Sequence, residues 1–425
     1  MSTDTSSPTV TSSAGALSRR TFVRAGVGAS AALLSGAAGA PWAAASARGL
    51  KVYVLVIDGC RPGEITADNT PRLFALKTSG LRFPRARSMP VMETIPNHTM
   101  MMSGMRPDRT GVPANSIYDR GEQVVRNLDR PSDLRVPTLL DRLPGHGHPT
   151  GSVLSKEYLF GIFGTRATYR WEPEPIVPVS GHAPDFFTIN ALIAMVSEAD
   201  PDLVFVNLGD IDRFGHADYT GTTVRAARRT ALHDTDTQIG RFVDLLHDTG
   251  RWERSVVIVL ADHSMDWSQP DNLVSLQPAL DADPLLAGQV VIAQNGGADL
   301  LYWTGSAGQR DRAVRHIRRV VTGVEGVLAV HDPAYLRLGP LAGDLVAFCR
   351  AGWRFSDPRP VSNPIPGNHG HPATEPIPLW ICGGHPSVER RISALFGHTT
   401  DVAPTVGRLF GLPEPRGGYD GRHLR

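Results

Sequence analysis

Cysteine is scarce in this sequence, which contains only three among 425 residues. They stand far apart, at Cys60, Cys349 and Cys382, so at most one disulfide can form. A disulfide-rich fold is therefore excluded, and we expect buried free thiols.

An excess of charge of either sign is also missing. Lysine and arginine together number 43, and aspartate and glutamate number 42. Without residues 1–47, which we place outside the fold, 40 basic and 41 acidic residues remain, and the formal net charge is −1. Because binding to a phosphate backbone depends on an excess of basic side chains, nothing in the composition indicates a nucleic-acid partner.

The apolar stretch near the N-terminus is too short to cross a membrane. Gly, Ser and Pro interrupt it before it reaches the ~20 residues that a membrane-spanning helix needs. It follows Ser-Arg-Arg-Thr-Phe-Val at 18–23 and ends in Ala-Ser-Ala at 45–47, a pattern that is typical of a twin-arginine export signal. We therefore predict a secreted protein without a membrane anchor, whose mature chain begins near Arg48.

Short apolar runs that stop at acidic residues predict the fold of the mature chain. Three of them occupy 51–57, 202–208 and 255–261. Runs of this kind are typical of parallel strands that are buried on both faces. Residues 221–249 carry apolar positions at helical spacing and predict a crossover helix between the last two strands. We predict an α/β fold with a doubly wound, mostly parallel central sheet, helices on both of its faces, and a smaller cap or insert.

The remaining segments complete this organisation. Stretches richer in Pro, Gly and Asp at about 264–300 and 331–377 predict insertions around the mouth of an active site. No internal repeat is visible, so a single catalytic domain over 48–425 is expected. Further helices are predicted over 71–79, 97–104, 185–199, 308–321 and 401–410.

Acidic residues and histidines gather where the predicted strands end, and ligands of open α/β sheets bind at that edge. Asp212 and His216 stand four apart, so one helical turn would place both on one face. His369 lies between glycines, where a histidine has little packing role. Mixed imidazole and carboxylate groups favour a hydrolytic metal site over structural calcium sites. The candidate ligands are Asp58, Asp212, His216, Asp262, His263 and His369.

Thr94, in the run Pro-Val-Met-Glu-Thr-Ile-Pro-Asn-His at 90–98, is the candidate nucleophile. A threonine hydroxyl is a poor nucleophile at neutral pH unless a divalent metal such as Zn²⁺ lowers its pKa. Thr94 and the ligand set together predict a two-metal phosphoester hydrolase.

The order and spacing of these residues resemble the alkaline phosphatase superfamily, and within it the nucleotide pyrophosphatase/type I phosphodiesterase branch. The resemblance implies that Asp58, Asp262, His263 and the Thr94 oxygen hold one metal. It implies that Asp212, His216 and His369 hold the other, and that Asn115 contacts a phosphoryl oxygen. It spans nearly the whole mature chain, through stretches at 57–62, 94–98, 103–104, 106–108, 115–119, 212–216, 236–263, 343–346, 367–370 and 401–405.

This resemblance implies in-line attack by Thr94 on a small-molecule phosphoester, a phosphothreonine intermediate and its hydrolysis. The sequence departs from the nucleotide-cleaving members at several positions, among them Gly209-Asp210-Ile211, which replaces an acidic-proline run. Ile95 replaces an aromatic residue that stacks on the base, Asn207 replaces a tyrosine, and Glu93 replaces a lysine. Phosphoryl chemistry is therefore expected, with a leaving group that the sequence does not identify.

Several alternatives stay open at the level of sequence. A phosphomonoesterase or phosphonate hydrolase on the same scaffold would need an extra cation near the transferred group, and Arg61 or Arg106 is a candidate for it. A sulfatase is disfavoured because no cysteine stands at the nucleophile position. A binding protein that lost the chemistry should lack some metal positions, and none is missing.

Overall fold

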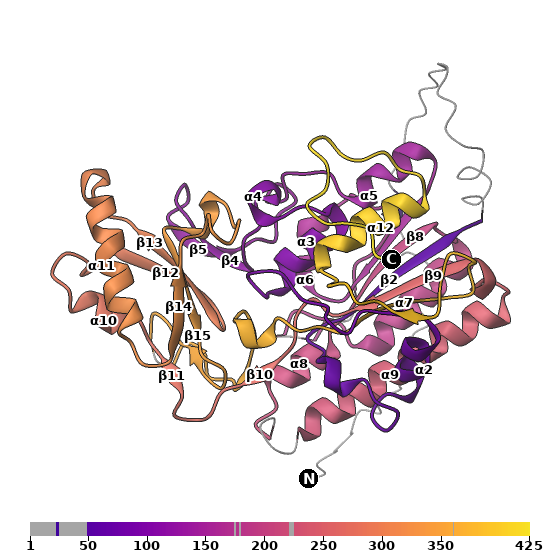
Figure 1. The fold of residues 1–425 in the computed structure, drawn as a ribbon, viewed down its shortest axis with the longest axis horizontal. Coiled ribbons are helices and arrows are strands. Elements are labelled where there is room, and N and C mark those ends of the chain that lie inside the picture. Colours follow the sequence, from indigo (N-terminus) through magenta and orange to yellow (C-terminus); the bar gives the residue numbers. More distant parts are fainter. Residues whose placement is uncertain (1–22, 25–48, 174–175, 178–179, 221–224, 360) are drawn as a thin grey trace, which may run out of the picture.

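The computed structural model describes residues 23–24, 49–173, 176–177, 180–220, 225–359 and 361–425. A large central sheet with helices above and below it forms the main body, and a smaller sheet lies at one end of the molecule (Figure 1).

The central sheet contains nine strands in the order β1-β7-β6-β8-β2-β9-β18-β3-β19. Its middle is parallel, since β7, β6, β8, β2 and β9 pair in the same direction, while β18 pairs with β9 and β3 in the opposite one. All seven residues of β2 are buried, as expected for a run rich in Val, Leu and Ile that is covered on both faces. The bounds are β1 Val23–Arg24, β7 Tyr169–Trp171, β6 Thr150–Leu154, β8 Leu203–Leu208, β2 Lys51–Ile57, β9 Ser255–Leu260, β18 Leu379–Cys382, β3 Leu81–Arg82 and β19 Arg391–Ile392.

Helices cover both faces of this sheet and confirm the doubly wound architecture. Below it in Figure 1 lie α2 (Pro71–Ser79), α7 (Asp185–Glu198), α8 (Asp210–His216) and α9 (Ala226–Asp248). Above it lie α3 (Thr94–Ser103), α5 (Leu139–Arg142), α6 (Glu157–Phe163) and α12 (Val402–Leu409). Gly250, with φ +63°, follows α9 in the left-handed conformation that commonly ends a helix.

The smaller sheet confirms the expected cap or insert. It contains β12 (Val290–Asn295), β13 (Ala298–Trp303), β15 (Leu345–Cys349) and β14 (Val327–His331), all antiparallel. Helices α10 (Gln277–Asp281) and α11 (Arg310–Thr322) contact it, and its hydrophobic cluster is separate from the main core. The hairpin of β4 (Ser116–Asp119) and β5 (Val124–Asn127) reaches from the main body to β12. The division into one domain with insertions at about 264–300 and 331–377 stays a prediction.

Two helix boundaries differ from the sequence prediction. Helix α3 begins at Thr94 rather than 97, because Pro96 fits the first turn, where no backbone N–H is required. Helix α9 begins at Ala226, and residues 221–224 of the predicted helix lie outside the described residues. Val23 and Arg24 pair antiparallel with β7, and the prediction that residues 1–47 are a signal peptide outside the fold stays a prediction.

Cys60, Cys349 and Cys382 are free and buried, which confirms the prediction of buried thiols. Within the part of the chain that the structure describes, no helix is long and apolar enough to span a membrane.

Candidate active site

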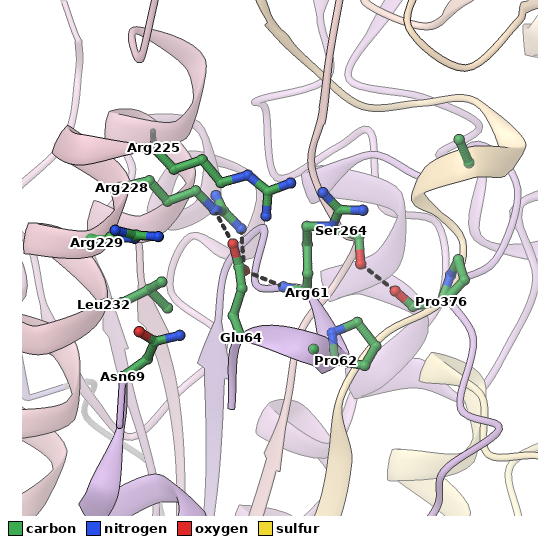
Figure 2. Close-up of a pocket in the computed structure, with 12 residues that line it drawn as sticks. Arg61, Pro62, Glu64, Asn69, Arg225, Arg228, Arg229, Leu232, Ser264 and Pro376 are labelled. Carbon is green, nitrogen blue, oxygen red and sulfur yellow. Dashed lines mark hydrogen bonds and ion pairs between the residues drawn. The ribbon is translucent and has the colours of Figure 1, made fainter. Parts of the chain in front are cut away.

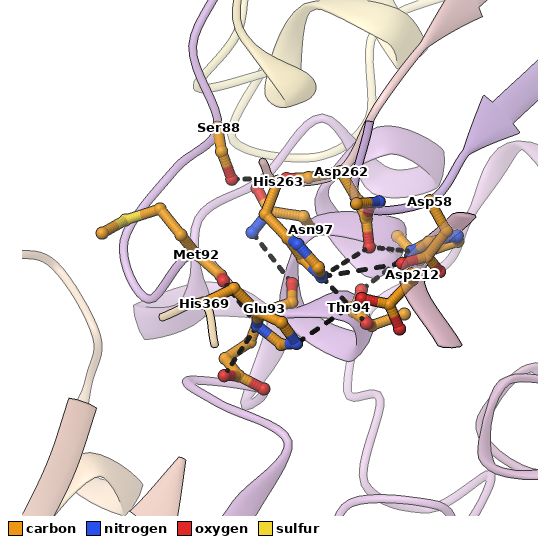
Figure 3. A network of polar contacts seen from close by, with 12 residues as sticks. Asp58, Ser88, Met92, Glu93, Thr94, Asn97, Asp212, Asp262, His263 and His369 are labelled. Atoms are coloured by element: carbon orange, nitrogen blue, oxygen red, sulfur yellow. Dashed lines mark hydrogen bonds and ion pairs between the residues drawn. The ribbon is translucent and has the colours of Figure 1, made fainter. Parts of the chain in front are cut away.

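The predicted site residues converge at the carboxyl edge of the parallel strands (Figure 3). Asp58 directly follows β2, and Asp262 comes two residues after the end of β9. Asp212 and His216 share the single short helix α8 that follows β8. The fourth segment carries His369, directly after the short strand β17 (Gly367–Asn368). The structure therefore brings together side chains from four segments, of which the first and the last are more than three hundred residues apart.

Thr94 is the first residue of α3 and is buried, and its Oγ1 lies 3.2 Å from Nε2 of His263. The N-terminus of a ten-residue helix favours negative charge at this position. Asn115 lies beside it, because its Oδ1 accepts a 2.8 Å hydrogen bond from the backbone N–H of Ile95. Both residues line one open pocket of about 280 Å³.

Asp58, Asp262 and His263 form the first cluster. Nε2 of His263 lies 3.3 Å from Oδ2 of Asp262 and 3.6 Å from Oδ1 of Asp58. All three side chains are fully buried. Burial, followed by the charge of Asp262, raises the pKa of Asp58 well above its ordinary value, and Lys156 acts in the opposite direction.

Asp212, His216 and His369 form the second cluster. Oδ1 of Asp212 lies 3.4 Å from Nε2 of His216 and 3.9 Å from Nε2 of His369. The two Nε2 atoms are only 3.1 Å apart. Two imidazole nitrogens and a carboxylate oxygen that face one point are the donor set that Zn²⁺ and similar ions bind.

Three carboxylate oxygens test whether this site fits metal ions. Oδ1 of Asp58, Oδ1 of Asp212 and Oδ2 of Asp262 are buried, and none has a hydrogen-bond partner among the described residues. A buried carboxylate oxygen without a partner is costly. Each of the three aspartates belongs to a group of candidate ligands whose ligand atoms lie within 4.8 Å of one another. The residues therefore fit divalent cations, which would satisfy all three oxygens.

The outer nitrogens of the three histidines are held by hydrogen bonds. Nδ1 of His216 contacts the carbonyl oxygen of Gly367 at 2.8 Å, and Nδ1 of His263 contacts that of Ser264 at 3.0 Å. Nδ1 of His369 lies 3.1 Å from Oε1 of Glu93. Such contacts on the far side of a ring keep its Nε2 directed at a metal.

Glu93 also changes the charge of His369. Burial lowers the pKa of His369, but the Glu93 carboxylate outweighs it and raises the pKa to about 9. The position where related sequences carry a lysine is thus occupied by an acid that orients one of the candidate ligands.

Lys156 is a site residue that the sequence did not reveal. Its Nζ lies 2.9 Å from Oδ2 of Asp58 and 2.7 Å from Oδ2 of Asp212, and so joins the two clusters. Burial lowers its pKa, but Asp212 and Asp58 outweigh this and raise the pKa well above its ordinary value. Lys156 comes two residues after β6, so recognition of Thr150–Leu154 as a parallel strand would have pointed to it.

Asn207 and His98 belong to a hydrogen-bond network that includes Asp58. The Asn207 amide donates to Oδ2 of Asp58 at 2.7 Å and lies 3.0 Å from Nε2 of His98. Ser155 donates to Oδ1 of Asn207 at 2.6 Å. The asparagine that replaces a tyrosine is therefore part of the hydrogen-bond network around the first cluster.

Arg61 and Arg106 do not line the pocket at Thr94. Arg61 faces a different pocket, and the backbone N–H of Arg106 donates to Asp420 instead. Lys156 is thus the basic side chain that the structure places between the two clusters.

Comparisons with known proteins agree with this geometry. A family model described as type I phosphodiesterase / nucleotide pyrophosphatase matches residues 52–371. Bis(5'-adenosyl)-triphosphatase ENPP4 of Bos taurus is 24% identical over 244 residues, which are 54% of this chain and 51% of the relative. The chain thus spans about half the length of this and several other curated relatives.

Two solved structures share the fold. Murine ectonucleotide pyrophosphatase/phosphodiesterase 5, an inactive variant in complex with AMP, has a TM-score of 0.71 and 17% identity, covering 86% of this chain and 96% of that one. Phosphonoacetate hydrolase from Sinorhizobium meliloti, in complex with phosphonoformate, has a TM-score of 0.64 and 17% identity, covering 85% and 95%. With the family match over most of the sequence, the chain belongs to the type I phosphodiesterase/nucleotide pyrophosphatase family, whose members are hydrolases of phosphoester and phosphoanhydride bonds.

Proposed function

We propose that this protein is a two-metal phosphodiesterase, with Thr94 as its nucleophile and a phosphothreonine intermediate. The observation that carries the proposal is the set of three buried, unpartnered carboxylate oxygens, on Asp58, Asp212 and Asp262, which face the Nε2 atoms of three histidines. Asp58, Asp262, His263 and Thr94 would hold one divalent ion, and Asp212, His216 and His369 would hold the other.

Bound divalent ions would supply positive charge that lowers the pKa of the Thr94 hydroxyl and balances the negative charge of the transferred group. Burial lowers the pKa of His263 to about 3, so its ring is neutral at pH 7. With its Nδ1 proton on the carbonyl of Ser264, it directs the Nε2 lone pair toward the site. Zinc suits these imidazole and carboxylate donors.

The reaction then proceeds in two displacements. Oγ1 of Thr94 attacks phosphorus, the new P–O bond forms, and the bond to the leaving alkoxide breaks. The amide of Asn115, fixed by the backbone of Ile95, would donate to a non-bridging oxygen as charge develops there. Water then attacks the phosphothreonine and releases Thr94.

The pocket around Thr94 favours a polar leaving group over a stacked base. Ile95 is fully buried and offers no aromatic face. Six carboxamide side chains line the pocket instead: Asn115, Asn127, Gln294, Asn295, Asn363 and Asn368. The murine relative binds AMP, so nucleotides remain one class of substrate to be tested beside simple diesters.

Lys156 favours a second candidate, a phosphomonoesterase or phosphonate hydrolase. A dianionic phosphoryl or phosphonyl group needs one more positive charge than a diester, and Lys156 brings one between the two clusters. Its ammonium group is already paired with two carboxylates, so we place this function second.

A side-by-side assay separates these candidates. The kcat/KM of metal-loaded protein would be measured for bis(4-nitrophenyl) phosphate, 4-nitrophenyl phosphate and an adenine dinucleotide. We expect the diester to be cleaved faster than the monoester, and activity to vanish with chelator and return with Zn²⁺. A monoester rate far above the diester rate would replace phosphodiesterase with phosphatase.

We also propose that residues 1–47 direct export through the twin-arginine pathway. The supporting pattern is the arginine pair Arg19-Arg20 before an apolar stretch and Ala-Ser-Ala at 45–47. Replacing both arginines by lysine should leave the protein in the cytoplasm, as measured by fractionation. Unchanged export of that variant would contradict the proposal.

A further inference from the structure

A second pocket, of about 350 Å³, opens beside the loop that follows β2 (Figure 2). Arg61, Pro62 and Glu64 line it from this loop, and Arg225, Arg228 and Arg229 line it from the start of α9. Its lining residues do not include any that line the pocket at Thr94. It is therefore a separate cavity.

The charge of this pocket is unbalanced. Four guanidinium groups and one carboxylate line it, which leaves a formal charge of +3. Glu64 is paired with Arg228, because its two carboxylate oxygens accept hydrogen bonds of 2.6 and 2.7 Å from that guanidinium group. Among the described residues, Arg61 and Arg229 have no acidic side chain within ion-pair distance.

The positive charges of these arginines also repel one another. Burial, followed by the charge of Arg61, lowers the pKa of Arg225, and Arg228 and Arg229 act in the same direction. Three of these groups stand over the ring of buried Trp267, at 5.6 Å for Arg61, 4.8 Å for Arg225 and 5.2 Å for Arg228. These cation–π contacts stabilise three like charges close to one another, although the charges repel each other.

Backbone contacts join this pocket to the metal clusters. Arg228 donates to the carbonyl oxygens of Gly59 at 2.7 Å and Ile211 at 2.9 Å, the neighbours of Asp58 and Asp212. Ser264, which follows His263, lines the pocket as well. A ligand here would contact Ser264, next to His263, and Arg228, which is hydrogen-bonded to the neighbours of Asp58 and Asp212, without entering the active site.

We propose that this pocket is a binding site for a small phosphate dianion, either inorganic phosphate or the phosphate of a phosphomonoester. Guanidinium groups match phosphate oxygens with paired, charge-assisted hydrogen bonds. The fixed Arg228–Glu64 pair forms the floor, and Arg61 and Arg229 supply the uncompensated charge. The site does not depend on the proposed function, because no metal ligand lines it.

Calorimetric titration of metal-loaded protein with inorganic phosphate tests the proposal, using the double variant Arg61→Gln/Arg229→Gln. In the double variant, we expect the affinity of this pocket for phosphate to be at least about tenfold lower, so that its binding event is lost from the titration. Each charge-assisted hydrogen bond contributes on the order of a factor of ten to the affinity. Arg315→Gln, an exposed arginine on α11, is the control with the same type of charge loss and should bind as the wild type does. Glycerol 3-phosphate in place of phosphate distinguishes a free anion from a monoester.

The Asp212→Asn variant separates this site from the metal centre. Phosphate binding that disappears in Asp212→Asn but persists in the arginine variant belongs to the active site, and would overturn the proposal if it is the sole event observed. Phosphate should also raise the Tm of the wild type and of Asp212→Asn more than that of the folded arginine variant. Equal Tm shifts in all three would likewise contradict it.

Discussion

Two regions of opposite charge share the loop that leaves strand β2. On one side, Asp58 joins Asp212 and Asp262 in a buried cluster whose outer oxygens have no hydrogen-bond partner among the described residues. On the other side, Arg61 joins Arg225, Arg228 and Arg229 in an open pocket. In the first region carboxylates outnumber the single cation, Lys156, and in the second arginines outnumber the single carboxylate, Glu64.

The two regions differ mainly in whether their buried polar groups have partners. In the pocket, the fully buried Arg228 makes four hydrogen bonds to Glu64, Gly59 and Ile211, so the buried charge is paired, while Arg61 and Arg229 lie nearer to solvent. In the cluster, the unsatisfied atoms are themselves buried. Buried carboxylate oxygens without a hydrogen-bond partner create a stronger requirement for a ligand, so metal loss should affect this molecule more than phosphate loss.

Removal of the nucleophile should give the largest effect on the acidic side. Thr94→Ala deletes the oxygen that attacks phosphorus, and we expect kcat for a diester to fall by at least ~10³-fold, as for other enzymes that lose a covalent nucleophile. Steady-state kinetics with bis(4-nitrophenyl) phosphate measure it. Thr94→Ser keeps the hydroxyl and is the matched control. Undiminished turnover of Thr94→Ala at unchanged metal content would show that another group attacks.

On the basic side, loss of the paired carboxylate should destabilise the fold. Glu64→Gln keeps the shape but leaves Arg228 buried without a counter-charge, and breaking such a pair costs about 3–5 kcal/mol. Denaturant unfolding measures the free energy. A cost below ~1 kcal/mol would mean that the guanidinium is solvated in the absence of Glu64.

The same pair predicts how stability depends on pH. Burial raises the pKa of Glu64, but Arg228 outweighs this, and the pKa lies below its ordinary value of 4.5. A lowered pKa means that the pair contributes fully above about pH 4.5, the value in the unfolded chain, and that this contribution is lost as the pH falls through the folded value. The difference in unfolding free energy between wild type and Glu64→Gln should therefore shrink below pH 4.5, and a constant difference would contradict this assignment.

The sequence predicted the metal side better than the basic side. Asp58, Asp262 and Asp212 follow hydrophobic strands whose parallel pairing places their ends at one edge, so a local pattern defined them. Lys156 was not predicted because the strand before it, Thr-Gly-Ser-Val-Leu, lacks a strong apolar pattern. The roles of Asp58, Thr94, Asn115 and the other site residues stay predictions, although the structure gathers them in one place.

The arginine pocket had no comparable signal in the sequence. Arg61 and Arg228 are 167 positions apart, and their proximity depends on how α9 packs beside the loop after β2. Only Arg225, Arg228 and Arg229 are near neighbours in the chain, and a run of arginines at a helix start is more often a solvated face. Tertiary packing, which local pattern does not encode, creates this pocket.

Glu93 offers a smaller and more specific change on the acidic side. Glu93→Gln keeps a hydrogen-bond acceptor near Nδ1 of His369 but removes the charge that orients and polarises the ring. Loss of such a partner typically lowers metal affinity about 10- to 100-fold. Competition with a zinc chelator measures the affinity, and Glu122→Gln, a distant exposed acid, is the control. Equal zinc retention in both variants would remove Glu93 from the metal site.

An exposed ion pair between α2 and α9 gives the smallest effect and tests whether burial causes the difference. Arg72 of α2 and Asp244 of α9 lie 2.9 Å apart, but their side chains are 56% and 52% exposed. Solvent screens such a pair, so Asp244→Asn should cost no more than about 1 kcal/mol in denaturant unfolding, well below Glu64→Gln. The two distances are similar, and the pairs differ chiefly in their access to water. Similar losses in both variants would mean that contact with Glu64, rather than the burial of Arg228, sets the stability of the basic side.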